Sequence, residues 1–576
     1  MKASDYIAKC IADEGVHYVF GYQGGNIAHT IDSIGKRNDI EFVSTYNEQG
    51  ASFSACGYAL ENKTIGVALA SSGPGAINLI SGVANAYYDS IPCLFITGNV
   101  SIPTMKQSDE VRQNAFQEND IVSMVSKVTK YAITVLDEHD LRFHLEKALY
   151  LAKEGRPGPV LIDLPHNIQK ADLDFEKERS FTVKKNEVLT NDSEIDRIID
   201  IFKDSQRPLI IVGGGAQSTS AKARINQLLG MWNAPVVATL RGLDIVSHKK
   251  ENYIGFGGAY GNRSANYALK YADTILVLGS RLDERFVCTG NKELFTKKNI
   301  IHVDVDVVEL GRVISTEIKI NSTIEKLLSN LLNRNIPQLH FEKWIHTLHL
   351  WDNRFPSVTD DWTINKAVYE LTTNAKKDAI VSLDIGINQM CSAQAMRLNG
   401  KQHCYTSAGH GAMGCALPTA IGAAFANKAK VVDCYVGDGA LHMNIQELLM
   451  LAKNNLPVHV ILNNNKCLGM IRDFQTKAFD SRFVATVDEL QDVNYKDIAK
   501  AYKLNYYKVE STDGINTAID MINKPEPCFI ELVFSEETDT NPKLGIDMFN
   551  QLPLLSVVEI KQMEQEALIC GNTISW

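Results

Sequence analysis

Two apolar runs in the last third of the chain each end in a cluster of small or polar residues, and this pairing limits the possible folds most strongly. Residues 431–436 lead into Gly437-Asp438-Gly439, and residues 458–462 lead into Asn464-Asn465. Twenty-four residues separate Gly439 from Asn464, with a helix expected over 444–452. Such a strand–turn–helix–strand unit is parallel, so both clusters are predicted at the carboxyl edge of one sheet, where ligands bind in open α/β folds.

The rest of the chain repeats this alternation of short β-rich runs with amphipathic stretches, which is typical of parallel sheets. We therefore predict an α/β fold of three doubly wound parallel-sheet domains. The expected domains span residues 1–180, 190–335 and 362–540, with a charged linker at 176–187 and a tail, 541–576, folded over the active site. The other expected strands are 65–70, 93–97, 160–162, 208–212, 274–278, 300–304, 379–383 and 529–533.

Composition excludes several classes of protein. A net charge of −10 argues against nucleic acid or an anionic membrane as partner. No apolar run reaches the roughly 18–20 residues that span a bilayer. The eleven cysteines form neither a CxxC pair nor a zinc-site spacing, so free thiols in a reducing cytoplasm are expected. The first 20 residues fit an amphipathic helix (Ile7, Ile11, Val16) better than a signal peptide.

The paired polar clusters suit a metal-bound phosphate. Mg²⁺ prefers hard oxygen ligands and often shares them with phosphates. Asp438 offers a carboxylate, Asn465 an amide oxygen and Cys467 a main-chain carbonyl. Gly437 and Gly439 would let the backbone approach the phosphates, and the next helix would add N–H donors. Alone, the first cluster would be a tight turn and the second a strand cap, but the pairing favours the metal site.

This motif resembles that of thiamine-diphosphate-dependent enzymes, and within them the acetohydroxyacid (acetolactate) synthase-like family. The resemblance implies that the third domain binds the diphosphate and Mg²⁺. Met413, in the loop 407–414, would hold the two rings of the cofactor in a bent form. The other cofactor contacts that the resemblance implies here are Gly386, Asn388, Gly437, Gly439, Ala440, Leu468, Gly469 and Met470.

A glutamate in the first domain is the candidate catalytic residue. Glu48 lies between a strand-like run, 40–46, and a small-residue helix, 51–60. On its own it would be interpreted as a helix cap. The resemblance implies that Glu48 hydrogen-bonds the aminopyrimidine N1′ and so activates the cofactor, which needs a buried carboxylate able to share a proton. The residues implied around the pyrimidine are Tyr22, Gly25, Pro74 and Asn78.

Glu48 and Asp438 lie in different domains. In related enzymes the cofactor sits between the pyrimidine domain of one chain and the diphosphate domain of another. The resemblance therefore implies a homodimer or homotetramer with active sites between chains.

The middle domain carries a second set of matches. Gly213-Gly214-Gly215 follows a strand, which by itself is a weak dinucleotide signal. The resemblance implies FAD in an extended pose, without a redox role in the reaction. The alternative is an empty middle domain, as in catabolic acetolactate synthases and pyruvate decarboxylases. The implied FAD contacts are Gly213, Gly214, Gly215, Thr239, Leu240, Arg281, Asp283, Asp304 and Val305.

The resemblance also implies the reaction. A 2-oxo acid, with pyruvate the first choice, would lose CO₂, and its two-carbon unit would be transferred to an acceptor carbonyl. Phe116, Gln117 and Phe474 would border the substrate, and Arg285 could hold a carboxylate with its planar guanidinium.

Three departures from the biosynthetic acetohydroxyacid synthases leave the acceptor open. Phe474 stands where those enzymes carry Trp, and the glycine loop has Gln23 and Asn26 where they carry Pro and Ala. The tail Pro542-Lys543-Leu544 does not match their ending. A second pyruvate, giving acetolactate, is the first choice. A nucleotide-linked keto-sugar is the alternative, while a C–C bond hydrolase or lyase would share the cofactor motifs and an oxidase would use the flavin for redox chemistry.

Overall fold

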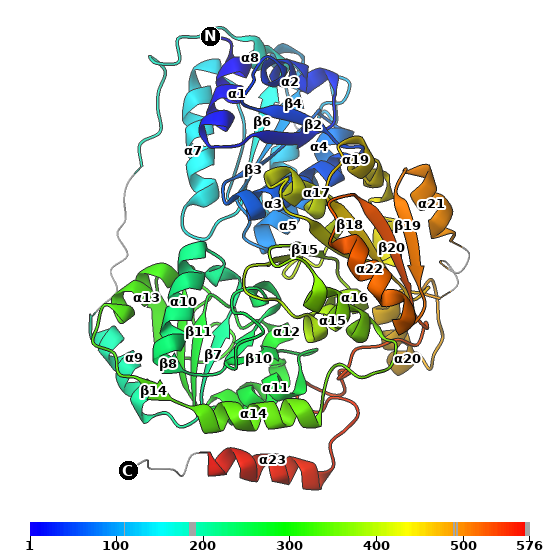
Figure 1. Ribbon diagram of the computed structural model, residues 1–576. Helices are drawn as coiled ribbons and strands as arrows, with labels where there is room; N and C mark the ends of the chain where they lie inside the picture. The colour runs from blue at the N-terminus through cyan, green and yellow to red at the C-terminus, as the bar shows by residue number, and fades with distance from the viewer. Residues whose placement is uncertain (109, 184–191, 488–489, 491–492, 571–576) are drawn as a thin grey trace.

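The computed structural model describes all residues except 109, 184–191, 488–489, 491–492 and 571–576. Within the described residues, three six-stranded parallel sheets follow one another along the chain, each flanked by helices (Figure 1). This confirms the prediction of three doubly wound parallel-sheet domains. The sheets lie within the expected domains, while the exact domain boundaries stay predictions. Part of the expected linker falls outside the described residues.

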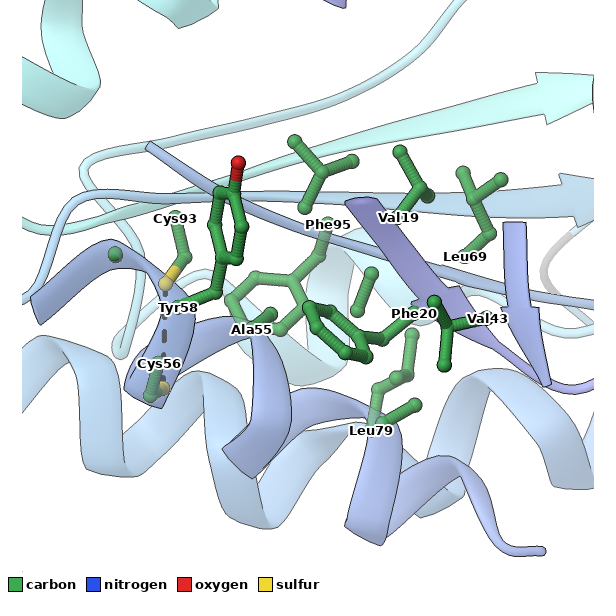
Figure 2. Packing of buried hydrophobic residues seen from close by; sticks show 14 of the residues in the cluster. Val19, Phe20, Val43, Ala55, Cys56, Tyr58, Leu69, Leu79, Cys93 and Phe95 are labelled. Atoms are coloured by element: carbon green, nitrogen blue, oxygen red, sulfur yellow. Dashed lines mark hydrogen bonds between the residues drawn. The ribbon is translucent and has the colours of Figure 1, made fainter. Parts of the chain in front are cut away.

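The first sheet has the strand order β2-β1-β3-β4-β6-β5. Its central strands are buried on both faces, as parallel sheets require. Figure 2 shows Phe20 and Phe95 of the strands in one buried cluster with Ala55 and Tyr58 of α3, and the centroids of the Phe20 and Tyr58 rings lie 6.0 Å apart. The strands are β1 Tyr18–Gly21, β2 Glu41–Ser44, β3 Gly66–Ala70, β4 Cys93–Asn99, β5 Tyr131–Thr134 and β6 Pro159–Pro165. The helices are α1 Ala3–Asp13, α2 Ala28–Gly35, α3 Glu48–Asn62, α4 Pro74–Asn78, α5 Ile80–Tyr88, α6 Ile121–Val125, α7 Leu141–Lys153 and α8 His166–Lys170.

The middle sheet has the order β10-β9-β7-β11-β12-β13, beside a two-stranded β14-β8 pair. The strands are β7 Pro208–Val212, β8 Trp232–Asn233, β9 Val236–Ala238, β10 Tyr253–Phe256, β11 Thr274–Leu278, β12 Asn299–Asp304, β13 Ile318–Asn321 and β14 Leu339–His340. The helices are α9 Asp192–Asp204, α10 Thr219–Met231, α11 Arg263–Tyr271, α12 Glu284–Val287, α13 Ile324–Leu332 and α14 Glu342–Arg354.

The third sheet has the order β16-β15-β17-β18-β20-β19. Strands β17 and β18 are neighbours, and Gly437 is in register with Asn463, which confirms that the two polar clusters share one carboxyl edge. The strands are β15 Ile380–Leu383, β16 His403–Thr406, β17 Val432–Gly437, β18 Val458–Asn464, β19 Asn505–Val509 and β20 Cys528–Val533. The helices are α15 Ile364–Asn374, α16 Ile387–Ala395, α17 Ala416–Ala426, α18 Asp438–Leu441, α19 Leu448–Lys453, α20 Gly469–Ala478, α21 Tyr495–Ala501 and α22 Ile515–Ile522.

Several local expectations needed correction. The helix expected over 444–452 is a 3₁₀ turn, Ile445–Glu447, followed by α19. The first helix ends at Asp13, so Val16 lies beyond it, although it is buried. The eleven cysteines are free as expected, and even the Cys56 and Cys93 sulfurs lie 3.9 Å apart (Figure 2). In the described part of the chain we find no helix with the length and apolarity needed to cross a bilayer.

Helices α3 and α17 join the first and third domains through small residues. A Cβ atom on Gly57 would lie 2.0 Å from the Thr419 carbonyl oxygen, and one on Gly422 would lie 1.9 Å from that of Ser54. Only glycine permits backbones to approach so closely. The Ser54 hydroxyl also donates to the Pro418 carbonyl oxygen at 3.0 Å. The two half-sites predicted in these domains are therefore held by one rigid joint.

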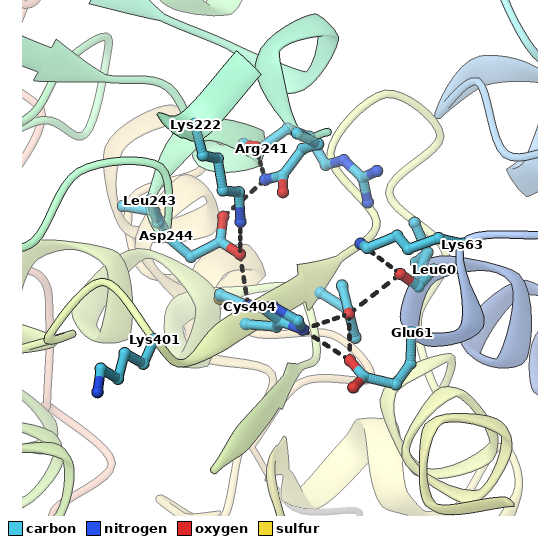
Figure 3. A network of polar contacts seen from close by, with 12 residues as sticks. Leu60, Glu61, Lys63, Lys222, Arg241, Leu243, Asp244, Lys401 and Cys404 are labelled. Carbon is cyan, nitrogen blue, oxygen red and sulfur yellow. Dashed lines mark hydrogen bonds and ion pairs between the residues drawn. The ribbon is translucent and has the colours of Figure 1, made fainter. Parts of the chain in front are cut away.

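A polar junction, which we define as Glu61, His403, Tyr405 and Lys430, lies beside this joint, and Figure 3 shows Glu61 near the end of α3. The Glu61 carboxylate, 4% exposed, pairs with His403 Nδ1 at 2.7 Å and Lys430 Nζ at 3.1 Å. The Tyr405 hydroxyl donates to it at 2.7 Å. Burial opposes ionisation, but these hydrogen bonds and charges outweigh it and lower the pKa of Glu61 to about 2.

Replacing Glu61 by glutamine is expected to lower the free energy of unfolding at neutral pH by about 1.5–3 kcal/mol, the contribution of hydrogen bonds to a charged group. The pKa of Glu61 is below its ordinary 4.5, so this stabilisation is complete above pH 4.5 and is lost as the pH falls toward 2. Denaturant titrations of both proteins at several pH values would measure it. An equal difference at pH 7 and pH 3 would contradict this assignment.

The tail runs along the middle domain to a last helix, α23 Val557–Ile569 (Figure 1). Lys543 forms ion pairs with Asp473 of α20 and with Asp539. Glu566 of α23 accepts a hydrogen bond from Trp351 Nε1 at 2.7 Å and pairs with Arg354 of α14. These contacts fix the tail against α14 and α20, while its predicted place over the active site stays a prediction.

Candidate active site

The carboxyl edge of the third sheet holds the predicted metal ligands. Helix α18 begins at Asp438, directly after β17, and Asp438 is 2% exposed. Its Oδ1 accepts the Gly439 amide at 2.7 Å. Its Oδ2 is buried and has no hydrogen-bond partner among the described residues. A buried carboxylate oxygen without a partner is costly unless a ligand satisfies it, so Asp438 fits a bound cation.

Three consecutive asparagines, the last two residues of β18 and the residue after it, lie at the same edge, each with a different partner. Asn463 Nδ2 donates to Asn388 Oδ1 at 2.6 Å, Asn464 Nδ2 to Glu531 Oε1 at 2.7 Å, and Asn465 Nδ2 to Cys467 Sγ at 3.2 Å. In the described part of the chain no donor is bonded to the Asn465 amide oxygen, which suits a metal ligand.

The pKa of Asp438 reflects both its burial and the nearby backbone of residues 465–467. Burial raises the pKa of Asp438 to about 6, although the backbone amides of Gly439 and of residues 465–467 favour the charged form and oppose the rise. The carboxylate thus lies against the segment that carries the other two predicted ligands. The oxygen-rich donor set fits Mg²⁺ and a diphosphate.

Asp384 at the end of β15 fixes the loop that carries Met413. Its carboxylate accepts the Gly414 amide at 3.0 Å and the Ala416 amide at 2.9 Å. Gly386 follows with φ of 83° and open space where a side chain would lie, so the backbone can approach a phosphate there. Burial raises the pKa of Asp384 to about 6.

Asn388 has a structural role that its motif does not reveal. Its Nδ2 donates to the Asp384 and Tyr435 carbonyl oxygens at 2.7 and 3.1 Å, and its Oδ1 accepts from Asn463. The side chain is therefore committed to the protein. A cofactor contact at Asn388, as predicted, would have to use the main chain.

Helix α20 borders the same edge. Leu468 precedes it, and a Cβ on Gly439 would lie 2.4 Å from Leu468 Cδ2, which explains the glycine. Gly469 and Met470 begin the helix, and Phe474 is 56% exposed on it. Ala440 lies buried in α18.

The first sheet's carboxyl edge holds the second half-site. Asn78 Nδ2 donates to Glu48 Oε2 at 3.0 Å, and a Cβ on Gly75 would lie 3.1 Å from Glu48 Oε1. Asn47 caps α3 by accepting the Gln49 amide at 2.7 Å. Because Asn47 fills the capping role, the Glu48 carboxylate is left for other chemistry.

The other predicted residues of this half-site follow strands of the same sheet. Pro74 and Asn78 form α4, while Tyr22 and Gly25 follow β1. Tyr22 is 46% exposed. Among the described residues, no hydrogen bond or ion pair joins Glu48 to Asp438 or Asn465.

The predicted substrate residues Phe116 and Gln117 lie on a loop beside the first half-site. A Cβ on Gly73 would lie 3.0 Å from the Gln117 carbonyl oxygen. Glu118 shapes this loop by accepting the amides of Lys106, Asn114 and Ala115 at 2.7–3.1 Å. Phe116 is 85% exposed and points away from the body of its own chain.

A cavity of about 510 Å³ lies between the middle domain and its neighbours, and its volume is usual for a ligand pocket. Eight of the nine residues predicted to contact FAD line it: Gly214, Gly215, Thr239, Leu240, Arg281, Asp283, Asp304 and Val305. Gly213 lies behind the wall, because a Cβ there would meet the Gly279 carbonyl oxygen at 2.5 Å. Gly213 thus allows close packing of two turns instead of lining the cavity.

Arg285 also lines this cavity. Its Nη2 lies 3.3 Å from Met390 Sδ, and its guanidinium lies 5.6 Å from the Tyr260 ring. Burial lowers the pKa of Arg285. The structure places Arg285 between the middle and third domains, apart from the loop with Phe116 and Gln117, and its contact with substrate stays a prediction.

Sequence reasoning missed three cationic residues that line the cavity: Lys63, Arg156 and Arg241. Burial and nearby Lys222 lower the pKa of Lys63 to about 8. Lys63 and Arg156 come from the first domain, and neither belongs to a recognisable nucleotide motif. Only the folded arrangement brings them to the wall, where they would favour an anionic ligand.

Comparison with known proteins agrees with this geometry. Residues 1–124, 195–331 and 384–532 match the models of the thiamine pyrophosphate enzyme N-terminal TPP binding domain, central domain and C-terminal TPP binding domain. The chain belongs to the thiamine pyrophosphate enzyme family.

Its relatives in that family include acetolactate synthases. The acetolactate synthase large subunit of Lactococcus lactis is 32% identical over 549 residues, covering 94% of each chain. The isozyme 2 large subunit of Escherichia coli is 32% identical, covering 93% of this chain and 96% of the relative. The chloroplastic acetolactate synthase 2 of Nicotiana tabacum is 32% identical, covering 94% and 83%.

Proposed function

We propose that this enzyme decarboxylates pyruvate with thiamine diphosphate and Mg²⁺ and transfers the two-carbon unit to an acceptor carbonyl, giving acetolactate when the acceptor is a second pyruvate. The presence of both predicted half-sites in a chain that resembles acetolactate synthases supports the proposal. The chain keeps both a buried Asp438 oxygen without a partner beside Asn465 and a Glu48–Asn78 pair free of capping duty, while acetolactate synthases match it along nearly its whole length.

Each half-site then has a defined task. Asp438, the Asn465 amide oxygen and the Cys467 carbonyl would hold Mg²⁺ and the diphosphate. Glu48 would bond the pyrimidine and move its proton, supported by Asn78. Thiamine diphosphate, when bound, would supply the carbon nucleophile needed for decarboxylation of the 2-oxo acid and transfer of its two-carbon unit. Met413 would set the angle between the cofactor rings.

We infer that two chains complete each site. Large apolar side chains are exposed around both half-sites, where a second chain would cover them: Tyr22, Ile77, Tyr88, Phe116, Met443 and Phe474. The Glu48 half-site of one chain would face the Asp438 half-site of its partner, in a homodimer or homotetramer. The free cysteines support a cytoplasmic location.

Two amide side chains at the first half-site, Gln23 and Asn26, favour a second candidate for the acceptor substrate. Gln23 is exposed, and Asn26 Nδ2 donates to Ser72 Oγ at 2.6 Å. These amides give this edge hydrogen-bonding groups where the biosynthetic pattern has Pro and Ala. A hydroxyl-rich acceptor such as a nucleotide-linked keto-sugar would suit them.

Product analysis tests the proposal. The holoenzyme is incubated with pyruvate alone, and then with pyruvate plus candidate aldehydes or nucleotide-linked keto-sugars. We expect CO₂ release that requires thiamine diphosphate and Mg²⁺, with acetolactate as the product from pyruvate alone. Absence of CO₂ release from pyruvate under every condition would refute the proposal, and a faster reaction with a keto-sugar would move the acceptor to the alternative.

We also propose that the middle cavity binds FAD without redox turnover. A bound flavin is then expected to keep its oxidised absorption spectrum when pyruvate is added anaerobically. Stopped-flow spectra over many turnovers measure this, with dithionite as the positive control for bleaching. Bleaching by pyruvate at the turnover rate would show an oxidase and overturn the carboligase proposal.

A further inference from the structure

The turn after Asp438 sends a buried carboxylate across to the first domain. Glu447, at the end of the 3₁₀ turn Ile445–Glu447, is 0% exposed. Its Oε1 accepts the backbone amide of Tyr46 at 3.0 Å, from a residue 401 positions away. The backbone amide of Asn47 also favours the charged form of this carboxylate. Glu447 therefore holds the two residues that directly precede Glu48.

The first turn of α3 is shaped to receive this carboxylate. A Cβ on Gly50 would lie 2.5 Å from Glu447 Oε1 and 2.8 Å from its Cδ. Only a glycine at position 50 leaves room for the carboxylate against the helix. The helix N-terminus also favours a negative charge at this point.

Glu447 is costly to bury, and packing alone does not explain it. Among the described residues no cation forms an ion pair with it, and its Oε2 has no hydrogen-bond partner. Burial raises the pKa of Glu447 to about 7, although the Tyr46 and Asn47 backbone opposes the rise. A methionine or leucine would fill the same space without the cost of desolvating a carboxylate.

The turn that carries Glu447 is itself fixed. Asn444 Nδ2 donates to the Gly414 carbonyl oxygen at 2.9 Å, and Gly414 is held in turn by Asp384. The turn that carries Glu447 is therefore connected to the Asp438 turn along the chain and to the Met413 loop by hydrogen bonds. Such a support can fix an atom position, whereas a mobile loop could not.

We propose that Glu447 is a positioning residue for Glu48: its carboxylate fixes the Tyr46–Asn47 backbone, and through it the direction in which the Glu48 side chain leaves the start of α3. The proposal rests on the catalytic role of Glu48 in the proposed function. Glu447 touches neither substrate nor cofactor in this role.

Three substitutions separate positioning from simple stability. Glu447→Gln keeps an oxygen that can accept the two amides. Glu447→Asp keeps the charge but withdraws it by one methylene, and Glu447→Ala removes the support. Asp352→Asn is the control, because Asp352 is a partly buried carboxyl in α14 of the middle domain that accepts a hydrogen bond from Ser264 Oγ at 3.0 Å.

The first measurement is hydrogen–deuterium exchange at C2 of thiamine diphosphate bound to the holoenzyme. We expect Glu447→Ala and Glu447→Asp to slow this exchange and kcat by about 10–100-fold, the usual cost of a misplacement near 1 Å. Cofactor Kd and the KM for pyruvate should change by less than about threefold, because ground-state binding is untouched. Glu447→Gln and Asp352→Asn should stay near the wild type.

The second measurement needs no cofactor. Amide hydrogen exchange of the peptide containing Tyr46 and Asn47 should be faster in Glu447→Ala and Glu447→Asp than in the wild type, and unchanged in Glu447→Gln. If Glu447→Ala does not fold, the comparison of Asp with Gln decides. Wild-type C2 exchange in Glu447→Asp would overturn the proposal, as would a Gln variant as slow as Asp.

Failure of the proposed function has a different signature. In that case the wild-type protein would not accelerate C2 exchange over the free cofactor, or Glu48→Gln would exchange as fast as the wild type. The amide-exchange result would still report whether Glu447 supports the start of α3.

Discussion

Replacing Glu48 by glutamine is expected to lower pyruvate-dependent CO₂ release by about 10²–10⁴-fold, the usual contribution of a positioned acid or base. Glutamine preserves the size of the side chain and can still accept the hydrogen bond that Asn78 donates to Glu48 Oε2. It cannot exchange a proton with the pyrimidine. Loss of activity without loss of structure would therefore report the missing proton transfer.

Steady-state CO₂ release at saturating thiamine diphosphate and Mg²⁺ measures this effect. Glu41→Gln provides the matched control, since Glu41 is an exposed carboxylate on neighbouring β2 and should leave activity unchanged. Unfolding curves should coincide for all three proteins within about 0.5 kcal/mol, as for most surface changes. A fully active Glu48→Gln protein would refute the assigned role.

Replacing Asp438 by alanine is expected to weaken Mg²⁺-dependent binding of thiamine diphosphate by at least about 100-fold, because loss of even an outer partner of a metal ligand costs 10–100-fold. The Oδ2 atom that would bind the metal has no other partner among the described residues. Its removal should therefore cost cofactor binding far more than protein stability.

Calorimetric titration with thiamine diphosphate, with and without Mg²⁺, measures this prediction. Asp520→Ala, an exposed site on α22, is the control. In the wild type, affinity should fall as the pH drops through about 6, because burial raises the Asp438 pKa to that value and a proton then competes with the metal. Equal affinity in the Asp438→Ala protein would exclude Asp438 as a ligand.

The sequence alone determined the fold class and the third-domain half-site. Apolar runs of 4–7 residues alternating with helical stretches allow little besides parallel sheets. Adjacent parallel strands then oblige Gly437 and Asn464 to meet at one edge, as the β17–β18 register confirms. These are local patterns joined by one short crossover, so periodicity was sufficient to find them.

Other features depend on side-chain partners that no sequence motif reveals. Asn47, and not Glu48, caps α3. The Asn388 side chain hydrogen-bonds to neighbouring protein groups. Arg285 lines the middle cavity. Glu447 reaches Tyr46 across 401 residues. Local sequence determines which helices and strands form. Contacts such as the one between Glu447 and Tyr46 depend on how the three domains pack together, so only the tertiary structure could reveal them.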